Sequence, residues 1–154
     1  MSHTKEELIK LIDLDEPDYS TIVAQLTADD IPLLIVLSND VNLAIATKAI
    51  SCLGMMNNEK AIDGISLSAK HDNPIIRVAA AHALKNLATF PNAVTLLDKL
   101  LDDKDIGVRK FALKTVNHAN ITSLKTKVKS MNLKEKTEFM KNLSNDVFIK
   151  IDKQ

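Results

Sequence analysis

The sequence predicts an all-α protein, a right-handed α-solenoid of about five antiparallel helix pairs. Aromatic residues make up only 3% of the 154 residues, and there are only 3 glycines. Sheet proteins draw on aromatic and β-branched residues and on glycine turns, so this composition disfavours a sheet. Apolar residues instead recur at helical spacing, and the pattern itself repeats every 31–32 residues. Such a period is typical of stacked helical repeats.

The repeat is defined by placing Ala46, Arg77 and Arg109 at a common position zero. Apolar or small residues then fall at −1, +3, +7 and +10, the spacing of one face of a helix. These columns are Ile45, Ile76 and Val108; Ala49, Ala80 and Ala112; Leu53, Leu84 and Val116; Met56, Leu87 and Ala119. A second stripe, at −15, −12 and −9, predicts a shorter first helix in each copy. Each copy is therefore expected to be a helix pair.

A stack of such pairs must be closed at both ends, because terminal units would otherwise expose an apolar face. We expect a single domain over 1–154, with an N-terminal capping pair in 1–28, three repeats in 29–119 and capping helices in 120–154. The expected helices are 4–12, 18–27, 30–38, 42–56, 59–70, 73–88, 92–101 and 105–118. A further helix is expected after a cap at Asn120, and another after a capping box at 132–135. The stretch from 145 is expected to dock as a short helix or to fray.

The second helix of each repeat carries its own start signal. Asn42, Asn73 and Asp105 share position −4, and these residue types are favoured N-caps. Pro74 suits the first helical position. Small side chains allow helices to approach closely, so Ala80 is expected in a helix–helix contact. Ala81 is expected nearer a groove, where a larger side chain would be tolerated.

Arg77 and Arg109 are expected in the first turn of their helices, where a positive charge opposes the helix dipole. We expect a compensating ladder, in which each guanidinium reaches an acidic residue in the turn of a neighbouring repeat. Asp40 and Asp103, both at position −6, are the expected acceptors.

These residues resemble a known family. The patterns D-x-N-x-x-I at 40–45, N-P-I-I-R-V-A-A-A-H-A-L at 73–84 and D-x-D-x-x-V-R at 103–109 resemble the turn signature of HEAT repeats. The sequence departs from the signature at Ala46, which replaces arginine, and at His71, which replaces aspartate. The resemblance implies an α-solenoid that serves as a scaffold for binding, since a fold alone does not assign an activity.

The motifs of common enzyme classes are missing. There is no nucleophile elbow, no glycine-rich phosphate loop, no paired-carboxylate motif and no H-x-x-x-H pair among the 4 histidines. The single cysteine, Cys52, is expected to pack as a small apolar side chain. We therefore predict no catalytic, cofactor or metal site, and no cofactor.

The charge is divided along the chain. Residues 1–103 carry 8 basic and 15 acidic residues, a net of −7, whereas residues 104–154 carry 12 and 5, a net of +7. On the second helices, His82, Lys85, Lys110 and Lys114 fall in the columns expected to line the concave face. We therefore predict a non-catalytic module that binds an acidic segment of a protein partner there.

Two alternatives stay open. The basic C-terminal half could bind a nucleic-acid backbone, although the lack of aromatic residues argues against sequence-specific readout. The chain could also be an enzyme or enzyme subunit, since some HEAT-like proteins are DNA alkyl-base glycosylases or bilin lyase subunits. No signal peptide or membrane span is expected, so we predict a cytoplasmic protein, monomeric or weakly self-associating.

Overall fold

Ten α-helices follow one another along residues 2–153, the part of the chain that the computed structural model describes, and no strand occurs among them. They are α1 (Lys5–Ile12), α2 (Tyr19–Val23), α3 (Ile31–Leu37), α4 (Leu43–Met55), α5 (Glu59–Ser68), α6 (Pro74–Ala83), α7 (Pro91–Leu100), α8 (Ile106–Ala119), α9 (Lys125–Lys134) and α10 (Glu138–Asp152). Short 3-10 helices lie at η1 (Ala28–Asp30), η2 (Leu84–Asn86) and η3 (Thr122–Leu124). The prediction of an all-α protein is confirmed.

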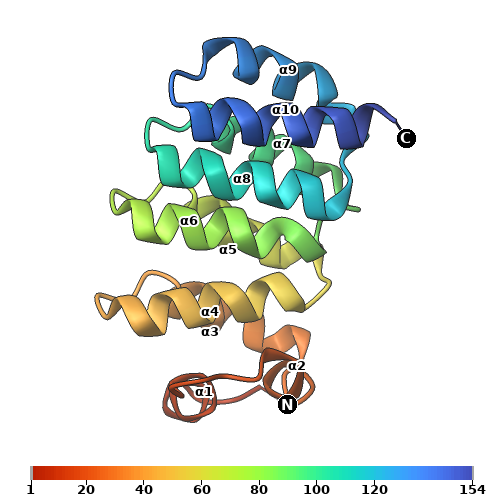
Figure 1. Cartoon of the computed structure of the whole chain (residues 1–154). Helices are drawn as coiled ribbons and strands as arrows, with labels where there is room; N and C mark the ends of the chain where they lie inside the picture. Colours follow the sequence, from red (N-terminus) through yellow and green to blue (C-terminus); the bar gives the residue numbers. More distant parts are fainter. Residues whose placement is uncertain (1, 154) are drawn as a thin grey trace.

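The helices stack as pairs in two layers (Figure 1). The second helices α4, α6, α8 and α10 lie side by side, each in contact with the next. The first helices α3, α5 and α7 form the layer behind them. Within each pair from α3–α4 to α9–α10, the connecting turn lies on the same edge of the stack, at the left of Figure 1. The chain is thus an α-solenoid, as its periodicity predicts.

The second helices begin where the sequence predicts. Asn42 accepts a hydrogen bond from the backbone N–H of Ala44, and Asn73 accepts one from Ile75. Asp105 caps α8 in the same way, through the N–H of Val108. These side chains supply acceptors for N–H groups that have no partner inside the helix, which fixes the register of all three repeats.

The repeated apolar stripe forms the core. All three alanines at +3 are fully buried, and so are all three residues at +7. Helices approach closely here: a Cβ placed on Gly54 would lie 2.6 Å from the carbonyl oxygen of Ala83, on the next second helix. The layer of second helices therefore depends on small side chains at its contacts.

Ala81 corrects one expectation. It is 0% exposed, like Ala80, and its carbonyl oxygen accepts a 2.8 Å hydrogen bond from the Thr115 hydroxyl of α8. Ala81, which we expected nearer a groove, is instead covered by α8 of the neighbouring repeat.

The C-terminal pair starts later than expected. Asn120 is not an N-cap but ends α8 in a left-handed conformation, with φ of 53°. No capping box forms at 132–135, because α9 continues through Asn132 and α10 begins after Thr137. The stretch from 145 is the second half of α10 as far as Asp152, and Gln154 lies outside the described residues.

The N-terminal end is held by a local cap and by a hydrogen bond between residues distant in the sequence. Thr4 and Glu7 form a capping box at the start of α1. The backbone N–H of His3 donates to the buried carboxylate of Asp30, which also accepts from the N–H of Thr27.

Within the described residues no helix is both long enough and apolar enough to cross a membrane.

Candidate functional site

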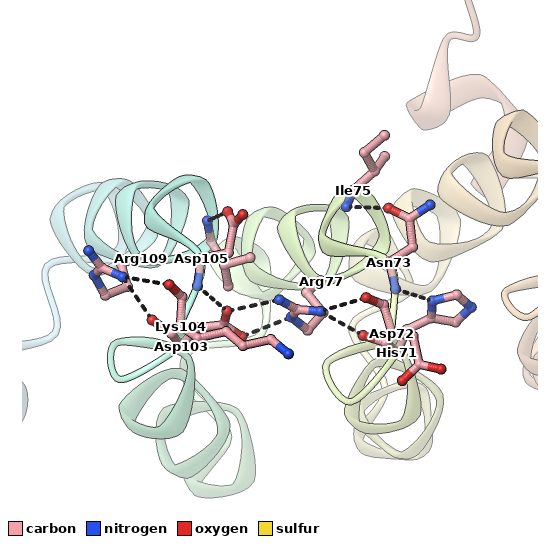
Figure 2. A network of polar contacts seen from close by, with 10 residues as sticks. His71, Asp72, Asn73, Ile75, Arg77, Asp103, Lys104, Asp105 and Arg109 are labelled. Atoms are coloured by element: carbon pink, nitrogen blue, oxygen red, sulfur yellow. Dashed lines mark hydrogen bonds and ion pairs between the residues drawn. The ribbon is translucent and has the colours of Figure 1, made fainter.

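Arg77 joins two successive turns of the stack (Figure 2). Its Nε donates to Asp103 Oδ2 at 2.9 Å, and its Nη2 donates to Asp103 Oδ1 at 3.1 Å. Nη1 donates to the carbonyl oxygens of His71 and Asp72, in the turn of its own repeat. The Arg77 side chain is only 7% exposed. Its two-pronged bond therefore ties the α5–α6 turn to the α7–α8 turn, and this contact outweighs the unfavourable helix dipole.

Arg109 makes the same set of bonds one repeat later. Its Nη1 donates to the carbonyl oxygens of Asp103 and Lys104, and its Nε lies 2.7 Å from Glu135 Oε1. The hydrogen bond to Glu135 raises the pKa of the Arg109 guanidinium. The acceptor is a glutamate that directly follows α9, because the C-terminal pair replaces the aspartate-containing turn.

Asp40 is placed differently from our expectation. Its Oδ1 accepts the backbone N–H of Asn42 within its own turn. The chain has only two arginines, and both donate to acceptors in later repeats. Asp40 therefore accepts no hydrogen bond from a guanidinium. Asp103 makes the equivalent bond to the N–H of Asp105, and so does His71 Nδ1 to that of Asn73. The side chain at position −6 thus accepts a backbone N–H within its own turn in all three repeats. Only Asp103 also binds an arginine.

The candidate binding site is the outer surface of α4, α6, η2 and α8, which we call the second-helix face. Residues 43–55, 74–86 and 106–119, which form these elements, contain no Asp or Glu, although the chain has 20 acidic residues. They do contain basic or titratable residues: Lys48, Arg77, His82, Lys85, Arg109, Lys110, Lys114 and His118. Lys48 pairs with Asp13 on another element, and Arg77 and Arg109 are bound to Asp103 and Glu135. The positive charge of this surface therefore comes from Lys85, Lys110 and Lys114.

A hollow of about 290 Å³ lies between α6 and α8 on this face. It is lined by His82, Lys85, Phe111, Lys114, Thr115 and His118. Lys85 Nζ lies 3.2 Å from His82 Nε2, and the His82 ring meets the Phe111 ring edge-on at 6.3 Å. Lys114 Nζ stands 5.5 Å from the centre of the same ring. The structure thus brings His82, Lys85 and Lys114 together around a phenyl ring.

Lys110, the fourth residue that the sequence indicated, does not line this hollow. Its Nζ lies 5.1 Å from the centre of the Phe139 ring on α10 and 5.8 Å from that of Phe111. It extends the positive surface toward the C-terminal pair instead. An ammonium group over an aromatic face is attracted to the ring without losing its charge.

A second hollow continues the surface toward α4. It is bounded by Tyr19, Ser51 and Met55 as well as by His82 and Lys85, which it shares with the first. His82 and Lys85 therefore stand on a ridge between a basic hollow and a largely uncharged one.

Electrostatics keep His82 neutral near pH 7. Burial lowers the pKa of its imidazole, and the neighbouring Lys85 and His118 lower it further. His82 therefore gains its proton only in more acidic solution, or when an anion binds beside it.

Phe111 and His118 are parts of the hollow that the sequence columns did not select. Phe111 lies at position +2, where an aromatic side chain would be expected to pack in the core. His118 lies at +9, one helical turn beyond the column of Lys114, and His82 and His118 are 36 residues apart. That separation, one repeat plus one turn, is the signal in the sequence that could have placed them on a shared face.

Cys52 is fully buried, and burial raises the pKa of its thiol to about 12. A thiol in that environment is protonated at neutral pH and is a poor nucleophile. Within residues 2–153, no group of three or more His, Cys, Asp or Glu side chains is arranged to hold a metal ion.

The class of protein follows from the fold and from the family comparison. The family model for HEAT repeats matches residues 31–117, more than half of the chain, so this protein belongs to the HEAT repeat family. Among solved structures, it is similar to a chain in the complex of CpcE and CpcF of phycocyanin lyase from Nostoc sp. PCC7120, with a TM-score of 0.66 and 17% sequence identity. The match covers 99% of the present protein but only 66% of the chain in that complex. No curated protein sequence gives a significant match.

Proposed function

We propose that this HEAT repeat protein is a non-catalytic binding module whose second-helix face holds an acidic segment of a protein partner. The observation that carries the proposal is the absence of Asp and Glu from 43–55, 74–86 and 106–119, the residues that form this face. A surface with one sign of charge attracts partners of the opposite sign.

The hollow between α6 and α8 supplies the centre of the proposed site. A carboxylate placed there would meet Lys85 and Lys114, which come from successive repeats, and the two histidines beside them. Phe111 offers an apolar surface between these cations. Charges arranged in this way raise the rate of association and select the sign of the partner, and their effect falls with ionic strength.

The proposal is tested with a fluorescent glutamate-rich peptide and the full chain, by anisotropy at two salt concentrations. We expect binding that weakens with salt and that is lost in Lys85→Glu plus Lys114→Glu. The matched control is Lys60→Glu plus Lys99→Glu, which makes the same charge change at exposed positions on the first helices α5 and α7. Equal binding by both double variants would contradict the proposal.

A labelled single-stranded oligonucleotide provides the second arm of this experiment. Binding to nucleic acid depends steeply on salt, because each phosphate contact releases a counterion. If the oligonucleotide bound more tightly than the peptide at both salt concentrations, nucleic-acid binding would replace the proposed function.

A lyase-type role is the second candidate, and the structural match to the CpcE and CpcF complex favours it. It is tested by incubating the chain with phycocyanin apoprotein and its chromophore and looking for covalent attachment on a denaturing gel. Attachment that depends on this chain would make it a lyase subunit rather than a binding module alone.

A further inference from the structure

Exposed apolar side chains gather along one edge of the stack. Ten large hydrophobic residues are exposed in the described part of the chain. Eight of them lie in, or within one helical turn of, the four turns that join α3 to α4, α5 to α6, α7 to α8 and α9 to α10. These eight are Val36, Val41, Leu43, Leu67, Ile75, Ile106, Leu133 and Phe139; the other two are Leu14 and Ile149. We call the side of the stack formed by these four turns the turn edge (left of Figure 1).

The apolar residues of the turn edge recur with the repeat. Leu43, Ile75, Ile106 and Phe139 each occupy the first turn of a second helix. Val41 is 100% exposed and Leu133 is 79% exposed. Single exposed apolar residues are ordinary, but a line of them across four consecutive repeats is typical of an interaction surface.

The charges on this edge differ between its two ends. The first turn carries Asp40. The last turn carries the exposed Lys134 and Lys136, on either side of Glu135, whose charge is compensated by Arg109. The exposed Glu138 begins α10 beside them, so the two lysines leave this end with a net positive charge. The two middle turns carry both signs. The edge therefore runs from an acidic end to a basic end, in the same direction as the change from −7 to +7 along the chain.

We propose that the turn edge binds the turn edge of a second copy of this chain, with the two stacks antiparallel. A two-fold axis between the second and third turns would place Asp40 of each copy against Lys134 and Lys136 of the other. It would also place Val41 near Leu133, and Ile75 near Ile106. A side-by-side parallel pair would instead set Asp40 against Asp40 and lysines against lysines, which costs free energy. The antiparallel pair is a closed, self-complementary interface, as most protein dimers are.

The charge arrangement gives a test by mixing two variants, measured by sedimentation equilibrium over a wide range of concentrations. The unchanged chain is expected to dimerise. Asp40→Lys alone should dissociate, because each end of the interface then sets a new lysine against Lys134 and Lys136. Lys134→Asp plus Lys136→Asp alone should dissociate, because each end then sets Asp40 against two new aspartates. An equimolar mixture of the two should associate again, because each interface regains opposite charges. A chain that stays monomeric at every concentration, or a mixture that does not associate, would overturn the proposal.

An apolar variant tests the same interface independently of charge. Val41→Ser plus Ile75→Ser should dissociate the dimer, whereas Leu14→Ser plus Ile149→Ser, off the turn edge, should not. Far-ultraviolet circular dichroism and a thermal melt establish that each variant is folded. Lys85→Glu plus Lys114→Glu should remain dimeric. If that variant is the one that dissociates, the copies meet through the second-helix face and the edge-to-edge arrangement is wrong.

Discussion

Arg77 and Asp103, 26 residues apart in sequence, form a two-pronged ion pair that joins the turns of two neighbouring repeats. Arg77 also donates to two backbone carbonyl oxygens of its own turn, and Asp103 also accepts a hydrogen bond from the N–H of Asp105. One pair of side chains thus fixes two turns and the spacing between them.

Removing this guanidinium should destabilise the stack. We expect Arg77→Ala to lower the free energy of unfolding by on the order of 3 kcal/mol, because it leaves a largely buried carboxylate and two carbonyls without their donor. Lys104→Ala, an exposed change in the α7–α8 turn, is the control and should have little effect. Chemical denaturation measures both, and equal midpoints for Arg77→Ala and the unchanged chain would contradict the prediction.

The ladder has a vacant rung that can be filled. Ala46 and His71 occupy the positions that Arg77 and Asp103 hold one repeat later. His71 lines a hollow between the end of α3 and the α5–α6 turn. We expect Ala46→Arg alone to destabilise the protein, since it buries an unpaired charge, and His71→Asp alone to keep its turn bond to Asn73. In the double variant the two changes should couple favourably by about 1–3 kcal/mol in a double-mutant cycle. Additive effects would show that no rung forms.

Ala80 and Ala81 should be equally sensitive to added volume. Both are fully buried, and the helix of Thr115 covers Ala81. Ala80→Leu and Ala81→Leu should each cost about 1–3 kcal/mol of stability, because neighbouring helices leave no room. Ala44→Leu, at an exposed position in the first turn of α4, should cost little. A milder effect at Ala81 than at Ala80, measured by thermal unfolding, would mean that α6 is rotated from its position here.

Cys52 should make stability fall in alkaline solution. Burial raises the pKa of its thiol to about 12, whereas the same thiol ionises in the unfolded chain at about 8.5. The contribution of the protonated thiol is therefore complete below about pH 8.5 and is lost as the pH rises toward 12. Cys52→Ala should show a shallower decline of unfolding free energy over this range. Parallel declines in the two proteins would contradict the assignment.

Binding to the glutamate-rich peptide should strengthen as the pH falls below about 6.5. The pKa of His82 is lowered by burial and by Lys85 and His118, so the free protein gains this positive charge only in acid, while glutamates stay ionised to about pH 5. Anisotropy titrations should show a rise in affinity that is smaller in His82→Gln. A pH-independent affinity, with binding otherwise intact, would remove His82 from the site.

The sequence by itself determined the periodic features of this protein. The 31–32-residue repeat, the caps at Asn42, Asn73 and Asp105, and the buried alanine column follow from spacing and residue type. Such features depend on interactions within one helix or between equivalent positions of adjacent repeats, and those interactions leave a regular pattern.

The tertiary structure decided the features that break the period. The sequence indicated Asp40 as an acceptor, but only the packed turns show that Arg109 reaches Glu135 and that Asp40 meets no guanidinium. The rotation of α6 that buries Ala81, and the hollow that joins Phe111 and His118 to His82, depend on how closely neighbouring helices approach. That distance is set by side chains distant in the sequence, such as Gly54 against Ala83, and no local pattern records it.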